Sequence, residues 1–150
     1  MKKGGRKMNR VNLITLGVKD LQLSLLFYRD GLGFQTSVRE ENPSIVFFNN
    51  AGTKLALYSL EALSKDISEN ERLTKQGFSG VTFAYNAKSA EEVDVIMGKA
   101  KKAGGTIVKP PQKVFWGGYS GYFADPDGYY WEVAYSKDWR FDQNDMLIIE

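Results

Sequence analysis

The sequence predicts an α+β fold of two tandem β-α-β-β-β modules, whose eight strands form a mixed, incompletely closed sheet around a concave cavity. Three observations predict this fold. Short segments of alternating apolar and polar residues, typical of strands, surround two segments with helical spacing. The elements follow the same order in each half of the chain. The length of 150 residues suits one domain, or two small halves that share a core.

The first module is expected over about residues 11–59 and begins with a strand at 11–18. A helix follows, with Asp20 as a potential N-cap and with Gly31 and Gly33 after its last apolar residue. The apolar residues of this helix recur at helical spacing: Leu21, Leu25, Phe27 and Tyr28. Turn-forming residues then separate three short strands, which complete the module: 34–39, 44–49 and 53–58.

The second module, over about residues 79–136, repeats this order. A strand at 80–85 precedes a helix that Ser89 caps and two consecutive glycines end. Three further strands complete the module: 106–108, 118–124 and 129–134. The last turn of each module also matches, and in this register Ala56 is the internal counterpart of Glu132.

Three segments flank or join the modules. Residues 60–78 are polar and acidic, and are interpreted as a linker that contains a short helix. Residues 1–10 are basic and are expected to be a disordered tail. The C-terminal tail, residues 137–150, ends in the apolar run MLII at 146–149, so we expect it to dock on the body or on a partner subunit.

The composition excludes several classes of protein. A net charge of +2 is too small to indicate nucleic acid as a partner, and Lys101, Lys102 and Lys109 are interpreted as part of a solvated face. No apolar run approaches the roughly 20 residues that cross a bilayer, so no membrane association is expected. The chain contains no Cys, which fits a cytoplasmic location.

Several motifs together resemble one known family. These are LGVKDL at residues 16–21, GLGF at 31–34, WGGYSGY at 116–122, DPDG at 125–128 and WEV at 131–133. They resemble the vicinal oxygen chelate superfamily, which includes glyoxalase I, bleomycin-resistance proteins, fosfomycin-resistance enzymes and extradiol dioxygenases. The resemblance covers about residues 11–136 and implies a homodimer in which paired modules complete each other's cavities.

The resemblance also implies where a metal would bind, and this chain departs from that pattern. Metalloenzymes of the superfamily take ligands from the first, fourth, fifth and eighth strands, which here correspond to Leu13, Ala56, Gly80 and Glu132. Only Glu132 offers a donor atom, and the whole sequence contains no His. We therefore expect no metal and no cofactor, which argues against glyoxalase or dioxygenase activity.

The candidate site is centred on Glu132. Its position between Trp131 and Val133 predicts, by strand alternation, that its carboxylate faces the concave cavity. The acid is either a ligand anchor or general base, or it is satisfied by tyrosine hydroxyls such as those of Tyr58 or Tyr130. The candidate ligand-binding set consists of Thr15, Tyr58, Thr82, Trp116, Tyr119, Tyr122, Tyr130 and Glu132.

Asp125 and Asp127 are not included in this set. In a DPDG turn, aspartate side chains usually accept hydrogen bonds from nearby backbone amides, and Gly128 supplies the positive φ. The two aspartates are therefore interpreted as turn residues and not as a catalytic pair.

The sequence leaves more than one class of function open. We favour a protein that binds a small organic, aromatic or antibiotic-like ligand in the concave cavity. The second hypothesis is a metal-independent isomerase or lyase in which Glu132 is the catalytic general base. The third is a structural or regulatory member that has lost its site, which would show a concave face filled by its own side chains.

Overall fold

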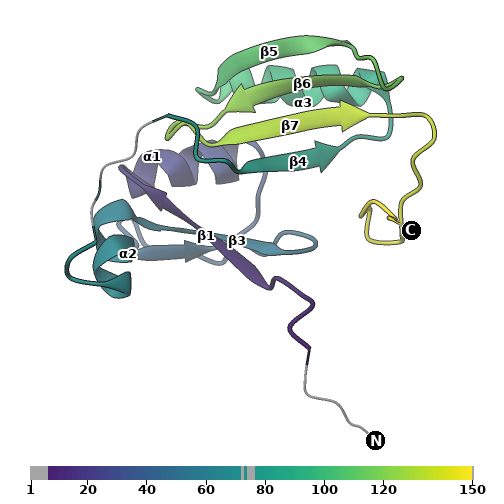
Figure 1. Cartoon of the computed structure of the whole chain (residues 1–150). Coiled ribbons are helices and arrows are strands. Elements are labelled where there is room, and N and C mark those ends of the chain that lie inside the picture. The colour runs from purple at the N-terminus through teal and green to yellow at the C-terminus, as the bar shows by residue number, and fades with distance from the viewer. Residues whose placement is uncertain (1–6, 72, 74–76, 150) are drawn as a thin grey trace, which may run out of the picture.

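A computed structural model describes residues 7–71, 73 and 77–149 of the chain (Figure 1). The elements of the first module are β1 (Leu13–Val18), α1 (Leu21–Leu25), its π-helical continuation η1 (Leu26–Gly31), β2 (Ile45–Phe47) and β3 (Lys54–Ser59). Helix α2 (Leu60–Ile67) lies in the segment between the modules. The elements of the second module are β4 (Thr82–Asn86), α3 (Ala90–Lys102), β5 (Thr106–Lys113), β6 (Tyr119–Ala124) and β7 (Tyr130–Tyr135).

The strands form two separate mixed sheets. One has the strand order β1-β3-β2 and the other the order β4-β7-β6-β5. In both, the last strand of the module pairs in parallel with the first and antiparallel with the strand before it. The α1–η1 segment lies between the two sheets, and α3 covers one face of the second sheet (Figure 1). The predicted class, α+β with two modules of the same topology, is confirmed.

The structure differs from the expected eight strands, because the described residues form seven. Residues 34–39, expected to be a strand, have no regular secondary structure. The segment does lie beside β2: Asn49 donates its backbone N–H to the carbonyl of Gln35 at 2.6 Å. However, the Thr36 side-chain hydroxyl donates to the Phe47 carbonyl at 2.7 Å. A side chain thus takes an acceptor that a backbone ladder would use.

Each helix with a predicted cap starts at that residue. The Asp20 carboxylate accepts from the Leu23 amide at 3.0 Å, and the Ser89 hydroxyl accepts from the Glu92 amide at 3.0 Å. The α2 helix has its own cap, because the Ser59 hydroxyl accepts from the Ala62 amide at 3.2 Å.

Ala56 and Glu132 occupy equivalent places in the two sheets. Ala56 on β3 lies between Thr15 of the parallel strand β1 and Phe47 of the antiparallel strand β2. Glu132 lies between Ala84 and Tyr122 in the same way. The registers therefore agree with the sequence repeat, residue for residue.

Aromatic rings join the two modules into one hydrophobic core. Phe27 and Tyr28 of η1 pack against Phe123 and Trp131 of the second sheet, with ring centroids 6.3 and 6.1 Å apart. Tyr28 also lies 6.0 Å from Phe48 of the first module. Because a single short helix packs on both sheets, the two modules share a core.

The turn at residues 125–128 has the predicted structural role. Asp125 Oδ1 accepts from the backbone amides of Asp127 and Tyr129 at 2.9 and 2.8 Å, and Gly128 has φ of 87°. The Asp127 carboxylate in turn accepts from the Lys19 amide at 2.9 Å and the Ser24 hydroxyl at 3.1 Å. The turn of the second module is thus also bonded to the start of the first module's helix.

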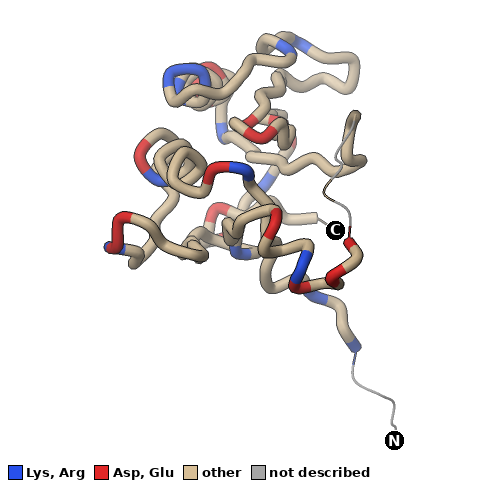
Figure 2. Tube along the Cα trace, turned by 90° about the vertical axis from the view of Figure 1, so that its left-hand side faces the viewer, with Lys and Arg blue, Asp and Glu red and all other residues tan. Residues whose placement is uncertain are grey.

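Charges of both signs are distributed over both modules (Figure 2). On α3 the first turn carries Glu91 and Glu92, and the last turn carries lysines, in the arrangement that the helix dipole favours. No described helix is long and apolar enough to span a membrane. Of the expected disordered tail, residues 1–6 lie outside the described part, and residues 7–10 are exposed without regular secondary structure.

Candidate functional site

A pocket of about 370 Å³ opens on the face of the second sheet that is turned away from α3. It lies between β5, the loop before β6, and the exposed face of β6 and β7. Three of the predicted site residues line it: Trp116, Tyr122 and Glu132. The other lining residues are Lys109, Gln112, Lys113, Val114, Phe115 and Ser120.

Glu132 and Tyr122 are direct cross-strand neighbours on β7 and β6. The pKa of the Tyr122 phenol is raised, first by burial and then by the charge of Glu132 and a hydrogen bond to its carboxylate. The tyrosine beside this acid is therefore Tyr122, whereas the sequence suggested Tyr58 or Tyr130 as examples of such a partner. Open volume adjoins the pair, because both residues line the pocket.

Trp116 forms a wall of the pocket and makes two close contacts with the protein. Its ring stacks on Trp139 of the C-terminal tail, with centroids 5.7 Å apart and an interplanar angle of 21°. The ring also lies close to Gly118, where an added Cβ would be only 1.9 Å from it. Gly117 has φ of 91° in the turn that leads to β6. These glycines thus serve a turn and a close approach.

The C-terminal tail contacts the body, although the apolar run on which this expectation rested stays partly exposed, with Met146 at 40% and Ile149 at 85%. Besides the Trp139 stack, Asp145 forms an ion pair with Lys88 at the start of α3. The Met146 side chain lies 2.6 Å from the position of a Cβ on Gly52, in the turn before β3. The tail therefore contacts both modules as well as a wall of the pocket.

The remaining predicted residues lie elsewhere. Thr15 and Tyr58 belong to the first sheet, and Thr82 is exposed at the start of β4. The Tyr130 ring stacks on Phe78, with centroids 5.7 Å apart. The expectation for Tyr119 is not met, because its hydroxyl donates to Asp94 of α3 at 2.7 Å and the side chain lies on the helix side of the sheet.

The corresponding face of the first sheet is covered by α2. A Cβ on Gly17 would lie 2.7 Å from the Leu60 side chain and 3.2 Å from that of Leu63. Ala56, the counterpart of Glu132, has no exposed surface. Half of the surface that the sequence assigned to a cavity is therefore closed by the chain's own helix, and the pocket belongs to the second module alone among the described residues.

The residues do not fit a metal ion. Leu13 and Ala56 lie in the first sheet, Gly80 precedes β4, and Glu132 is in the second sheet. Of these four side chains, only that of Glu132 can donate to a metal. Within residues 7–71, 73 and 77–149, no group of three or more His, Cys, Asp or Glu could hold a metal ion.

Two lysines of the pocket were missed by sequence reasoning. Lys109 was interpreted as part of a solvated face, and Lys113 lies beyond the strand expected at 106–108. The strand in fact continues to Lys113 through Pro110 and Pro111. Proline is tolerated here because β5 is an edge strand with irregular register. In the sequence, the pair Pro110-Pro111 was the signal that could have indicated an irregular edge strand.

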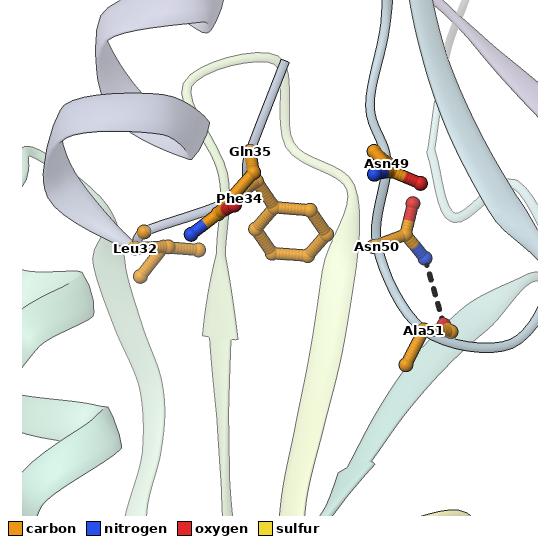
Figure 3. Close-up of a pocket in the computed structure, with 7 residues that line it drawn as sticks. Leu32, Phe34, Gln35, Asn49, Asn50 and Ala51 are labelled. Carbon is orange, nitrogen blue, oxygen red and sulfur yellow. Dashed lines mark hydrogen bonds between the residues drawn. The ribbon is translucent and has the colours of Figure 1, made fainter. Parts of the chain in front are cut away.

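A second hollow of about 310 Å³ lies between η1 and the turn before β3, and its wall includes Leu32, Phe34 and Asn50 (Figure 3). Phe34 belongs to the core, since its ring lies 5.5 Å from that of Phe48. The Asn50 side chain donates to the Ala51 and Thr53 carbonyls and accepts from the Leu55 amide. The Asn50 side chain thus stabilises its own turn, and no charged residue lines the hollow.

Comparison with known proteins agrees with this architecture. A sequence model of the Glyoxalase/Bleomycin resistance protein/Dioxygenase superfamily matches residues 10–133. The uncharacterized protein YraH of Bacillus subtilis (strain 168) is 30% identical over 115 residues, which are 76% of this chain and 88% of that protein.

Solved structures give the same result. A glyoxalase-related enzyme from Fulvimarina pelagi superposes with a TM-score of 0.83 at 32% identity, over 95% of this chain and 99% of that one. The hypothetical protein SA1046 of S. aureus has a TM-score of 0.71 at 26% identity, over 87% and 95%. Sequence and fold agree over most of the chain, and the protein therefore belongs to the glyoxalase/bleomycin resistance protein/dioxygenase superfamily.

Proposed function

We propose that this protein binds a small organic ligand in the pocket of the second module, without a metal. The observation that carries the proposal is that Trp116, Tyr122 and Glu132 line one pocket of about 370 Å³. Pockets of roughly 300–1,000 Å³ that combine aromatic walls with polar groups able to orient a ligand are typical of small-molecule sites. A planar ligand would stack on the indole of Trp116, while the Glu132–Tyr122 pair would accept or donate a hydrogen bond.

Metal independence is part of the proposal. Glu132 is the only acidic residue among those that line the pocket, and the chain has no His and no Cys. One carboxylate falls short of the three or four donors that a transition metal requires. The lack of Cys also suits a reducing compartment, and we propose a cytoplasmic location.

A second copy of the chain is the proposed cover for the open side of the pocket. Apolar side chains that line it are exposed: Phe115 completely and Trp116 by 41%. Clustered exposed apolar surface of this kind marks association sites more often than it remains in contact with water. We therefore propose a homodimer, which sedimentation at micromolar concentration would test: a monomer throughout contradicts it.

Catalysis with Glu132 as general base is the second candidate, because open volume adjoins its carboxylate. Glu132→Gln separates the two functions. If the protein only binds, this variant should keep a ligand with at most a moderate change in affinity. If the protein is an isomerase or lyase, the variant should still bind the substrate while turnover is lost.

A thermal-shift screen of aromatic acids, aromatic amines and peptide-like antibiotics tests the proposed function. We expect hits that disappear in Trp116→Ala and persist in Tyr85→Phe, a control tyrosine that bonds Glu92 outside the pocket. Hits that are equally strong in Trp116→Ala would place the ligand elsewhere, and the complete lack of hits would argue against the proposal.

A further inference from the structure

We infer that the pocket selects a planar ligand that carries a carboxylate or a similar anionic group, which Lys109 and Lys113 recognise. This inference rests on the proposed function and specifies the class of ligand. Lys109 and Lys113 are the two cations that line the pocket, and Glu132 is its one acid, so the lining carries an excess of positive charge. An anionic substituent should therefore be attracted, and a cation repelled, at the β5 side of the pocket.

Both lysines are available to a ligand. The ion pairs among the described residues are Arg29–Asp30, Lys65–Glu61 and Lys88–Asp145, and none involves Lys109 or Lys113. Glu132, in contrast, already interacts with Tyr122. The acid therefore has a partner in the protein, whereas neither ammonium group forms an ion pair with a described residue.

The backbone itself turns Lys109 toward the pocket. Ile107 pairs with Phe123, which belongs to the core face of β6. By strict alternation, a residue two positions later would face the core as well. Instead, the register shifts between Ile107 and Lys109, and Lys109 pairs with Tyr122 on the pocket face. Such a bulge redirects a side chain, and here it directs a lysine toward an aromatic pocket.

The resulting site has a defined polarity. Lys109 pairs with Tyr122, and Tyr122 pairs with Glu132, so the three residues form one row across β5, β6 and β7. Two strand spacings separate the backbones of the lysine and the acid by about 10 Å. A ring that stacks on Trp116 could therefore direct an acid group toward β5 and a hydrogen-bond donor toward β7. A ligand with only a cationic group would meet both lysines.

Three probes with the same ring and different charges test the inference: 2-naphthoate, 2-naphthamide and 2-naphthylmethylamine. Binding to the full chain is measured by calorimetry or ligand-observed NMR at low and at physiological salt. We expect the naphthoate to bind about tenfold more tightly than the amide and the amine to bind most weakly. The preference should shrink as salt rises.

Lysine variants link this preference to the pocket. Lys109→Met and Lys113→Met keep the aliphatic stem, and each should remove about threefold of the preference for the acid. Lys101→Met changes the net charge equally on exposed α3 and should leave it unchanged. A preference that survives both pocket substitutions, or falls equally with Lys101→Met, overturns the assignment to these lysines.

The outcomes also separate this inference from the proposed function. Equal binding of all three probes, or tightest binding of the amine, overturns the charge selection and leaves an aromatic binding pocket. No binding of any probe at millimolar concentration overturns both. Loss of naphthoate binding in Trp116→Ala, together with the lysine effects, supports both.

Discussion

The hydroxyl of Tyr28 donates a 2.6 Å hydrogen bond to Oδ2 of Asp125, inside the core that the two modules share. Tyr28 comes from the first module's helical segment and Asp125 from the last turn of the second. The indole N–H of Trp131 donates to the same hydroxyl at 3.1 Å. Burial is the main reason why the pKa values of both Tyr28 and Asp125 are raised. The Tyr28 hydroxyl is therefore the buried hydrogen-bond partner of both the Asp125 carboxylate oxygen and the Trp131 indole N–H.

Tyr28→Phe should therefore destabilise the protein by about 1–3 kcal/mol, because it leaves a buried carboxylate oxygen and a buried indole N–H without their partner. The free energy of unfolding from urea denaturation measures the effect. Tyr85→Phe is the matched control, since it removes a tyrosine hydroxyl bonded to Glu92 at the partly exposed start of α3. An equal decrease in the free energy of unfolding in the two variants would show that the buried hydrogen bonds contribute no more to stability than the exposed one.

Asp125 should make stability depend on pH in an unusual direction for a carboxylate. Its pKa in the folded state is raised above 3.8, so the folded protein binds the proton more tightly than the unfolded chain does. As pH rises from 3.8 through the raised value, this group's contribution to the free energy of unfolding falls, and above that value it is constant. The unfolding free energy of the wild type minus that of Asp125→Asn should decrease across this window. A difference that rises with pH would contradict the assignment.

Glu132→Gln should lower the pKa of Tyr122, because both the charge of Glu132 and its hydrogen bond to the phenol raise that pKa. Burial, the largest cause, remains in the variant, so the pKa should stay above the ordinary tyrosine value. Titration of the tyrosine ring by NMR measures it. The pKa of Tyr85, which burial and Glu92 raise to about 12, should be unchanged and serves as the internal control. An unchanged Tyr122 would mean that the two side chains do not interact in solution.

Trp139→Ala should release Trp116 and weaken ligand binding, because the two indoles are stacked at the pocket wall. Stacked indoles couple their transitions and give a paired positive and negative band in far-ultraviolet circular dichroism, which the substitution should remove. Phe141→Ala changes another aromatic ring of the same tail, near Lys88, and should keep the band. If the band survives in Trp139→Ala, the tail does not hold this tryptophan.

Gly118→Ala and Gly98→Ala should have opposite effects. A Cβ at Gly118 would lie 1.9 Å from the Trp116 ring, so the ring must leave its position and both the stacking band and ligand binding should diminish. Gly98 lies in α3 with open space around its Cβ position. There the alanine should raise the free energy of unfolding by up to about 1 kcal/mol through helix propensity. Full ligand binding in Gly118→Ala would contradict the described position of Trp116.

Much of the fold and part of the site can be predicted from the sequence, because they depend on local signals. Asp20 and Ser89 cap helices through side chains that bond amides three residues later. The turn at 125–128 is set by its own aspartate and glycine. The repeat of these local signals also identified Ala56 as the counterpart of Glu132, and strand alternation placed Glu132 on the face opposite the core.

Two features that local periodicity misplaced depend on interactions with another segment of the chain. Alternation holds only while a strand is regular, so it could not place Lys109, which a bulge turns toward the pocket. Residues 34–39 lose their ladder to a side-chain hydrogen bond. Tyr119 differs from these cases: it lies three residues before Tyr122 on the regular strand β6, so alternation alone places it on the opposite face.

The two-module architecture, the lack of a His or Cys donor for a metal, and the presence of Trp116 and Tyr122 beside Glu132 could be predicted from the sequence, since these follow from residue identity and local spacing. Three other features depend on the tertiary structure: α2 covers part of the first module's face, Trp139 supports Trp116, and two lysines line the pocket. The physical reason is that covering a face, stacking two rings and turning a side chain at a bulge each depend on where a distant segment packs.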